Sequence, residues 1–484
     1  MIRIFPFALV ALASLLAQCR AESQAIVRLD PARTQGVWEG WGVSLCWWAK
    51  VFGDRNDLAD VLFTTRETTV AGEKLPGLGL NIARYNAGAC SGNTVDGRKM
   101  AASKTIVPFR QIQGFWLDPK STDPASRSWD WSADGNQRAM LQKARDRGAT
   151  RFELFSNSPM WWMCANDNPS GAAIGAEDNL PPRNYDVFAT YLATIARYAK
   201  DHWGITFTSV EPFNEPASGY WSQNGKQEGC GFSLASQAAF LPCLRAALDR
   251  QGLNSMPIVA SDETSFTEAL QTWRSFPTGV KALVSRVNVH GYEGAKGPRA
   301  ELQAAVAAGG KPLWNSEHGD KIADGLDMAR DLMLDFQQLR PSAWCYWQAL
   351  DGGNHGGWGL LDADLTKKTI GRVNPKFFVF AQFTRHIRPG MTILDTGDAN
   401  LCAAYDPRHH RLVLVLRGGD QASTKQIDLV KFHVPAQTAE CWITEPKSIA
   451  RYAKRPRPHI EGGRISVELP PGSIETVEIA NAAW

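Results

Sequence analysis

Short apolar runs alternate with longer amphipathic stretches along most of the chain. Eight short runs have the length and composition of buried strands, and they span residues 38–48, 78–87, 151–157, 207–213, 257–261, 286–290, 312–316 and 343–348. In three of the stretches between them, apolar residues recur every three or four positions, which predicts helices over residues 184–202, 233–250 and 326–339. Strands that alternate with helices are typical of βαβ units, so this pattern predicts an α/β fold with a (β/α)8 TIM barrel over residues 38–389.

The pattern changes after Pro389. Apolar residues then gather in runs separated by turn residues, without a helical stretch, at residues 401–405, 411–416, 426–434, 439–443 and 465–479. Such runs predict a smaller antiparallel β-sandwich domain over residues 390–484. The segment 22–37 precedes the barrel, and its residues 23–31 have the pattern of a further strand. We expect this segment to join the sandwich, which would make the second domain discontinuous.

The first 21 residues have the pattern of a signal peptide. Arg3 supplies the positive start, residues 4–17 are apolar but too short to span a bilayer comfortably, and Ala21 suits the position before a cleavage site. This predicts a secreted or periplasmic protein. Cys19 raises the alternative of a lipid anchor, which Gln18 disfavours because such sites have a small residue there. We expect no membrane span, since no later apolar run is long enough to cross a bilayer.

Composition excludes some partners and favours others. The net charge of +3 over 484 residues is spread along the chain and gives no reason to expect a nucleic-acid partner. Eighteen tryptophans are present; some will belong to the core, but several stand beside Gly, Asn or Ser in predicted loops, where stacking on sugars is the better interpretation. We expect a monomer with a polysaccharide or oligosaccharide substrate.

Nine cysteines are present, eight of them after the predicted signal peptide. There is no Cys-x-x-Cys pair, so neither a zinc site nor a thiol redox centre is indicated, and nothing in the sequence implies a metal or a cofactor. Cys46 ends the first predicted strand and Cys90 follows the second. Because neighbouring strand ends can lie at disulfide distance, we expect these two cysteines to form a bridge.

Two carboxylates stand out at the ends of the predicted strands, where barrel enzymes carry their catalytic groups. Glu215 follows the fourth strand and Glu317 follows the seventh, on roughly opposite sides of the barrel mouth. Hydrolysis of a glycosidic bond needs such a pair, one carboxyl protonated and the other ionised. Either glutamate alone could instead form a structural salt bridge, for example with Arg84. Insertions rich in Gly, Pro, Ser and Asn, near residues 90–130 and 163–182, are predicted to be loops on this face.

Several stretches resemble a known family. Asn214-Glu215-Pro216 after an apolar strand is similar to the acid/base motif of retaining barrel glycosidases. More narrowly, the chain resembles glycoside hydrolase family 30, and most of all its endo-β-1,6-galactanase branch. The matching stretches are WEGWGVSLCWWAKVFG (38–53), LGLNIARYNAG (78–88), RFELFSNSPMWWM (151–163), NPSGA (168–172), FTSVEPFNEP (207–216) and LWNSEHGD (313–320).

The resemblance implies roles for individual residues. Glu215 would be the general acid/base and Glu317 the nucleophile of a retaining mechanism, with the two carboxyl groups roughly 5–5.5 Å apart. Asn214 would bind the sugar 2-hydroxyl, and Arg84 would hold the nucleophile. The remaining candidates would line the sugar site, namely His290, Tyr292 and Trp347, and less strongly Trp47, Trp48, Trp161, Trp162 and Trp221.

The substrate implied by the resemblance is β-1,6-galactan, as in the side chains of arabinogalactan. The same mechanism acting on xylan, a β-1,6-glucan or a glycolipid such as glucosylceramide stays open, because loop shape decides the substrate. A catalytically inactive carbohydrate-binding barrel is the alternative from a different functional class. It would be expected to lack one carboxylate, and both are present here.

Overall fold

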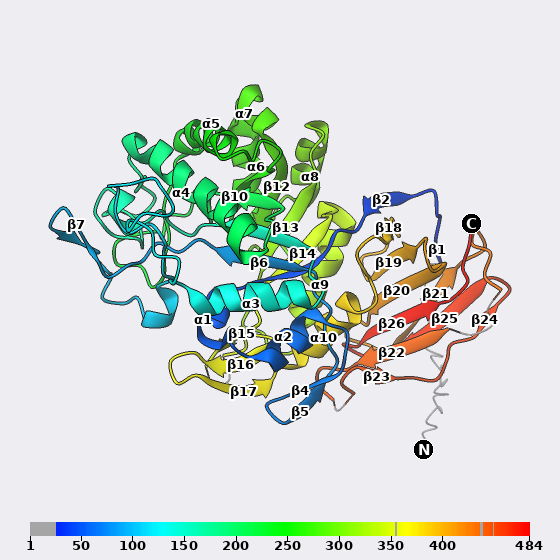
Figure 1. The fold of residues 1–484 in the computed structure, drawn as a ribbon. Helices are drawn as coiled ribbons and strands as arrows, with labels where there is room; N and C mark the ends of the chain where they lie inside the picture. Colours follow the sequence, from blue (N-terminus) through cyan, green and yellow to red (C-terminus); the bar gives the residue numbers. More distant parts are fainter. Residues whose placement is uncertain (1–25, 354–355, 436–438, 449) are drawn as a thin grey trace, which may run out of the picture.

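The computed structural model describes residues 26–353, 356–435, 439–448 and 450–484. Eight parallel strands close into a barrel, because the last strand pairs with the first (Figure 1). In barrel order they are β3 (Gly40–Ser44), β6 (Ile82–Asn86), β9 (Arg151–Phe155), β10 (Ser209–Glu211), β11 (Ile258–Glu263), β12 (Val284–His290), β13 (Leu313–His318) and β14 (Ala343–Gln348). All eight predicted barrel strands are therefore present, and the predicted fold class is confirmed.

Nine α-helices among the described residues lie between barrel strands along the chain, and α10 follows the last one. They are α1 (Trp48–Phe52), α2 (Asn56–Phe63), α3 (Gly135–Asp146), α4 (Tyr185–Tyr198), α5 (Leu234–Arg250), α6 (Phe266–Ser275), α7 (Thr278–Leu283), α8 (Arg299–Ala308), α9 (Leu326–Leu334) and α10 (Pro375–Thr384). Helix α5 begins after Ser233, whose side-chain oxygen accepts a hydrogen bond from the amide of Ser236. The predicted helices over 184–202 and 326–339 each end in a π-helical turn, Ala199–Trp203 and Asp335–Leu339.

Two further sheets lie beside the barrel in Figure 1; most of their strands follow the barrel along the chain and are drawn from orange to red, whereas β1 and β2 precede it. One has seven strands, in the order β2 (Thr34–Val37), β18 (Thr392–Leu394), β19 (Leu401–Asp406), β20 (Arg411–Arg417), β26 (Ile474–Ile479), β22 (Glu440–Thr444) and β23 (Ala453–Lys454). The other has four, in the order β1 (Val27–Arg28), β21 (Ser423–Asp428), β25 (Arg464–Leu469) and β24 (Ile460–Glu461). One apolar cluster draws side chains from both sheets, as in a β-sandwich.

Strand β20 explains how this sandwich meets the barrel. Leu412, Leu414 and Leu416 point into the cluster between the two sheets, while Val413 and Val415 belong to the large apolar core of the barrel. A strand buried on both faces has an uninterrupted apolar sequence, as LVLVL does here. Helix α10 is bound to the same sheet by two hydrogen bonds of Gln382. Its side-chain amide donates to Thr444 Oγ1 at 2.9 Å, and its backbone carbonyl accepts from the hydroxyl of Thr476.

The N-terminal segment adds a strand to each of these sheets. Strand β1 pairs in parallel with β21, and β2 pairs in antiparallel fashion with β18. The predicted signal peptide at residues 1–21 lies outside the described residues. The domain boundaries at residues 37/38 and 389/390 stay predictions.

Two strand predictions in the sandwich need correction. The run 465–479 is two strands in different sheets, because Pro470-Pro471-Gly472 interrupts it and a proline cannot donate within a ladder. The run 426–434 is shifted, since β21 ends at Asp428. The sequence pattern also missed α10 and a small sheet of β15 (Leu350–Gly352), β16 (Leu361–Asp364) and β17 (Thr369–Val373). Short hairpins complete the described strands, β4 (Thr68–Val70) with β5 (Glu73–Leu75) and β7 (Thr94–Val95) with β8 (Arg98–Lys99).

Within the described residues, no helix has both the length and the apolar content needed to cross a membrane.

A buried carboxylate ties the outer helices to two barrel strands. Asp335 accepts hydrogen bonds from Arg299 at 2.7 Å, from Asn315 of β13 at 2.7 Å and from Trp344 of β14 at 3.0 Å. Asp335 and Arg299 are each about 1% exposed. Breaking such a pair leaves an uncompensated charge in the interior.

We therefore expect Asp335→Ala to lower the free energy of unfolding by about 3–5 kcal/mol, as measured by denaturant unfolding. The matched control is Asp201→Ala, which removes the partly exposed Arg197–Asp201 pair within one helical stretch. That pair is worth only about 0.3–0.5 kcal/mol. Equal losses for the two variants would contradict this account of Asp335.

Candidate active site

A cavity of about 690 Å³ opens at the C-terminal ends of the barrel strands. Both candidate glutamates, Glu215 and Glu317, line it together with Asn214 and Tyr292. The aromatic side chains in its wall are those of Trp47, Tyr220, Trp221, Tyr292, Trp347 and Trp358. The cavity thus has the mixture of apolar surface and converging polar groups that is typical of a small-molecule site.

Glu215 is held in an unusual backbone conformation. It follows β10 in the Asn214-Glu215-Pro216 turn, and its φ of +51° is uncommon for any residue other than glycine. Its amide donates to the carbonyl of Asp262 at 2.8 Å, and its carbonyl accepts from the indole of Trp221 at 2.8 Å. These bonds fix the direction in which the carboxyl group enters the cavity.

Glu317 receives two hydrogen bonds from protein donors. Tyr292 donates to one carboxylate oxygen at 2.7 Å, and Arg84 Nη1 donates to the other at 3.3 Å. Burial raises the pKa of the Tyr292 hydroxyl well above its usual value, and the neighbouring glutamates add to the effect, so the hydroxyl keeps its proton. Both donors favour the ionised form of Glu317.

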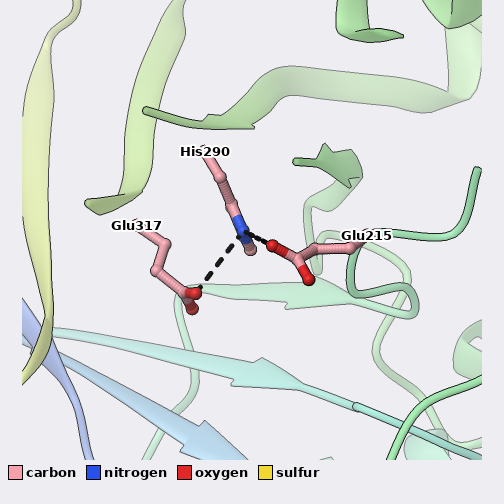
Figure 2. Close-up of side chains that lie close together, drawn as sticks. All are labelled: Glu215, His290 and Glu317. Atoms are coloured by element: carbon pink, nitrogen blue, oxygen red, sulfur yellow. Dashed lines mark hydrogen bonds and ion pairs between the residues drawn. The ribbon is translucent and has the colours of Figure 1, made fainter. Parts of the chain in front are cut away.

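His290 lies between the two glutamates (Figure 2). Its Nδ1 is 3.0 Å from Glu215 Oε1 and 3.5 Å from Glu317 Oε1. The register of β12 against β13 shifts at Val289–His290, so that His290 stands opposite Glu317. On its other side, Nε2 is 3.2 Å from Asp262. Burial alone would lower the pKa of His290, but the surrounding carboxylates raise it well above its usual value, which makes the ring an imidazolium.

The two glutamates lie close enough for their charges to interact. A carboxylate oxygen of Glu215 lies within 4.8 Å of one of Glu317. Burial raises the pKa of Glu317 to about 7; Glu215 reinforces this increase, while His290 and Arg84 oppose it. The protonation of Glu317 therefore depends on the charged groups around it.

The same three side chains have the spacing of a possible metal site. Ligand atoms of Glu215, His290 and Glu317 all lie within 4.8 Å of one another. An imidazolium has a proton on both nitrogens and offers no lone pair to an ion. The protonation that the carboxylates favour therefore disfavours a metal at this position.

The candidate tryptophans fall into two groups. Trp47, Trp221 and Trp347 line the cavity, and the rings of Trp47 and Trp347 meet edge to face at 5.1 Å. Trp48, Trp161 and Trp162 do not line it. Trp48 donates to the carbonyl of Ser44, Trp161 to Ser91 and Trp162 to the carbonyl of Trp116, so the structure places these three in the packing beneath the loops.

Some residues of the site were not singled out from the sequence. Tyr220 donates a short hydrogen bond to Glu215. Its side chain lines the cavity, and so do the side chains of Arg110, Asp351 and Trp358. None of the four lies on a predicted barrel strand: Tyr220 and Trp358 lie in loops, Arg110 in a short 3-10 turn and Asp351 in the short strand β15, and no period in the sequence reveals which way these side chains point. Asp262, which binds Arg84, could have been found, because it directly follows a predicted strand.

The predicted disulfide between Cys46 and Cys90 is wrong. Both are buried free thiols; Asn157 donates to Cys46 Sγ at 3.9 Å, whereas Cys90 donates to Glu228 at 3.2 Å. The strand ends do lie side by side, but the two side chains turn to different partners.

Comparison with known proteins identifies the family. The model of "O-Glycosyl hydrolase family 30" matches residues 24–275. An endo-β-1,6-galactanase of Hypocrea rufa is 46% identical over 475 residues, covering 98% of each chain. The chain belongs to glycoside hydrolase family 30. This confirms the family predicted from the strand-end motifs, and the protein is accordingly a glycoside hydrolase. An exo-β-1,6-galactobiohydrolase of Bifidobacterium longum subsp. longum is 22% identical over 88% of this chain and 37% of its own length.

Solved structures share the fold of this family 30 member at low sequence identity. A conserved exported protein from Bacteroides fragilis matches with a TM-score of 0.79 at 18% identity, over 94% of this chain and all of that one. The catalytic domain of a family 30 xylanase C from Talaromyces cellulolyticus matches with a TM-score of 0.70 at 19% identity, with the same coverage. The barrel with its attached sheets is therefore a shared architecture.

The raised pKa of Glu317 gives a prediction for the pH dependence. Burial raises this pKa to about 7, so Glu317 gains a proton as the pH falls through about 7. A carboxyl group that attacks carbon must be ionised, so if Glu317 is the nucleophile, kcat/KM should fall about tenfold per pH unit below about pH 7. A rate profile between pH 4 and 9 checks this, and a kcat/KM that stays flat from pH 7 down to pH 4 would contradict it.

Proposed function

We propose that this glycoside hydrolase cleaves β-1,6-linked galactan by double displacement, with Glu215 as acid/base and Glu317 as nucleophile. The observation that carries the mechanism is the approach of the two carboxylates to within 4.8 Å. Retaining enzymes have their carboxyl groups about 5–5.5 Å apart, whereas inverting enzymes leave about 6.5–9.5 Å for a water molecule. The spacing supports direct attack by one carboxylate on the anomeric carbon.

In the first step, Glu317 attacks the anomeric carbon and Glu215 gives its proton to the departing oxygen. The glycosidic bond breaks, and a covalent glycosyl-enzyme forms. In the second step, Glu215, now ionised, takes a proton from a water molecule, which attacks the same carbon and releases Glu317. Each step inverts the anomeric centre, so the product keeps the β configuration.

The location of one proton decides the two roles. Burial raises the pKa of Glu317 to about 7 even though Arg84 opposes the increase, so Glu317 is ionised above that pH. In this productive form we assign the proton to Glu215, because Arg84 and the hydroxyl of Tyr292 both donate to Glu317 and stabilise its negative charge.

Other side chains support the sugar during these steps. The side-chain oxygen of Asn214 is buried, without a hydrogen-bond partner among the described residues. We assign it to the sugar 2-hydroxyl, an interaction that strengthens in the transition state. Trp347 would carry the face of the reacting sugar, with Trp47 packed against its edge.

The substrate assignment rests on the relative from Hypocrea rufa, named an endo-β-1,6-galactanase, which matches this chain over almost its whole length. A β-1,6 linkage has one more rotatable bond than other glycosidic links, so its polymer is flexible. Aromatic surfaces that order it lower the entropic cost of binding. We also propose that the enzyme is exported and acts on polysaccharide outside the cytoplasm, on the strength of the signal-like residues 1–21.

A panel of polysaccharides tests the substrate. Activity should be highest on arabinogalactan from which the arabinose has been removed, because its β-1,6-galactan side chains are then uncovered. Release of reducing ends from this polymer, from xylan and from β-1,6-glucan would be compared at equal enzyme concentration. Strong cleavage of xylan with none of galactan would reject the assignment.

Substitution of each glutamate separates their roles. Glu317→Gln should abolish turnover of every substrate, because the covalent intermediate cannot form. Glu215→Gln should lose about 10²–10⁴-fold on polysaccharide, the usual value of acid–base assistance. With an activated aryl glycoside it should instead give a burst of aryl alcohol and then slow turnover, which azide accelerates because azide needs no base.

Glu293→Gln is the matched control, since Glu293 pairs with Thr267 outside the cavity wall and should behave as the wild type. Near-normal cleavage of polysaccharide by both active-site variants would overturn the catalytic roles. A first product with the α configuration, observed by NMR, would reject the retaining mechanism.

A further inference from the structure

The cavity has two chemically different ends. One end is formed by the segments after β10 and β11 and carries Tyr220, Lys226 and Thr264. The opposite end is formed after β14 and β3 and by the long insertion after β6. It carries Trp47, Arg110, Trp347, Asp351 and Trp358. In the barrel order, β10 and β11 lie across from β14 and β3.

The proposed roles assign each end to one part of the substrate. Glu215, at the β10 end, has to reach the departing oxygen, so the leaving sugar lies on that side. The sugars on the non-reducing side of the cleaved bond, the glycone, then extend toward Trp47, Arg110 and Asp351. This assignment rests on the proposed function.

Arg110 has an unsatisfied side chain at the glycone end. It closes the short 3-10 turn Pro108–Arg110, and its guanidinium carbon lies 4.2 Å above the ring of Trp47. Among the described residues its guanidinium has no hydrogen-bond acceptor and no ion pair, and its Nε is fully covered. Burial lowers the pKa of Arg110, an effect that Asp351 opposes. A half-buried cation with five donors and no acceptor is costly unless a ligand supplies one.

Asp351 supplies the complementary charge in the same cavity wall. It lies in β15, three residues beyond the end of β14, and is half-buried. Burial raises the pKa of Asp351, while Arg110 lowers it. No ion pair joins the two side chains, although each influences the other electrostatically. A donor and an acceptor therefore both line the glycone end without satisfying each other.

We propose that Arg110 and Asp351 form a galactose-selective subsite for the second glycone sugar, with Arg110 donating to its hydroxyl groups and Asp351 accepting from them. A 1,6-linked sugar keeps its 2-, 3- and 4-hydroxyls free, and each hydroxyl is both donor and acceptor. Galactose differs from glucose only in the configuration at carbon 4. Fixed, charged partners discriminate strongly between such isomers, because the wrong isomer leaves buried polar groups unpaired.

The experiment compares two substrates that have the same leaving group. 2,4-Dinitrophenyl β-1,6-galactobioside fills both glycone subsites, whereas 2,4-dinitrophenyl β-galactoside fills only the reacting one. Arg110→Met should lower kcat/KM for the galactobioside roughly 10- to 100-fold, the usual cost of losing a hydrogen bond to a charged group. It should lower kcat/KM for the galactoside much less, so the ratio of the two kcat/KM values falls. Asp351→Asn should lower the ratio by a smaller factor.

Arg110→Lys keeps the charge but loses the planar fork, and it should restore only part of the ratio. Selectivity provides a second readout: the preference for the galactobioside over 2,4-dinitrophenyl gentiobioside, its glucose counterpart, should narrow in Arg110→Met. The matched control is Arg138→Met, because Arg138 also lies over a tryptophan, Trp203, but outside the cavity wall. For this control, the kcat/KM ratio of galactobioside to galactoside and that of galactobioside to gentiobioside should both equal those of the wild type.

The outcomes separate the inference from the function on which it rests. If the wild type cleaves the galactobioside and Arg110→Met keeps both ratios, the subsite is wrong and the proposed function stands. If the wild type cleaves neither galactoside nor galactan, the proposed function fails, and the subsite fails with it. Thermal unfolding shows whether Arg110→Met is folded. If it is not, Arg110→Lys and Asp351→Asn decide by the same ratios.

Discussion

The guanidinium of Arg84 binds carboxylates from three other barrel strands. It donates to Glu153 of β9 at 2.8 Å, to Asp262 of β11 through a short hydrogen bond, and to Glu317 of β13 at 3.3 Å. Arg84, Glu153 and Asp262 are all fully buried. Charges of this kind are tolerated inside a protein only when each is paired and hydrogen-bonded, so the four strands are constrained to one arrangement.

The two candidate catalytic glutamates depend on that arrangement. Asp262 is ionised, because Arg84 and His290 hold its pKa well below the usual range even though burial would raise it. It therefore favours the protonated form of His290 from one side, while Glu215 and Glu317 face the ring from the other. The charge of the imidazolium favours the approach of the two glutamates to within 4.8 Å of each other. The geometry of the cavity thus depends on the buried charges of Arg84 and Asp262 beneath it.

The sandwich contributes to the same construction from outside. Its seven-stranded sheet is apolar on both faces, one toward the four-stranded sheet and the other toward the barrel and α10. Helix α10, which follows β14 along the chain, packs against β22 and β26 of this sheet. Between β14 and α10 the chain carries Asp351 and Trp358 into the cavity wall, next to Trp347 of β14. The segment that lines this side of the cavity is therefore anchored at one end in the barrel and at the other in the helix that packs on the sandwich.

The sequence by itself determined the eight barrel strands and the two glutamates at their ends. Apolar runs of strand length and the apolar stripes of helices reflect which faces of these elements must be buried. In a parallel barrel the C-terminal ends of all strands lie on one rim, independently of the loops that connect them. Only the tertiary structure decided the rest. It showed that Cys46 and Cys90 bind different partners, that Trp161 and Trp162 pack while Trp47 lines the cavity, and that Tyr220, Arg110 and Asp351 enter the site from segments outside the barrel strands. Such directions depend on contacts between segments distant in sequence, and local periodicity carries no information about them.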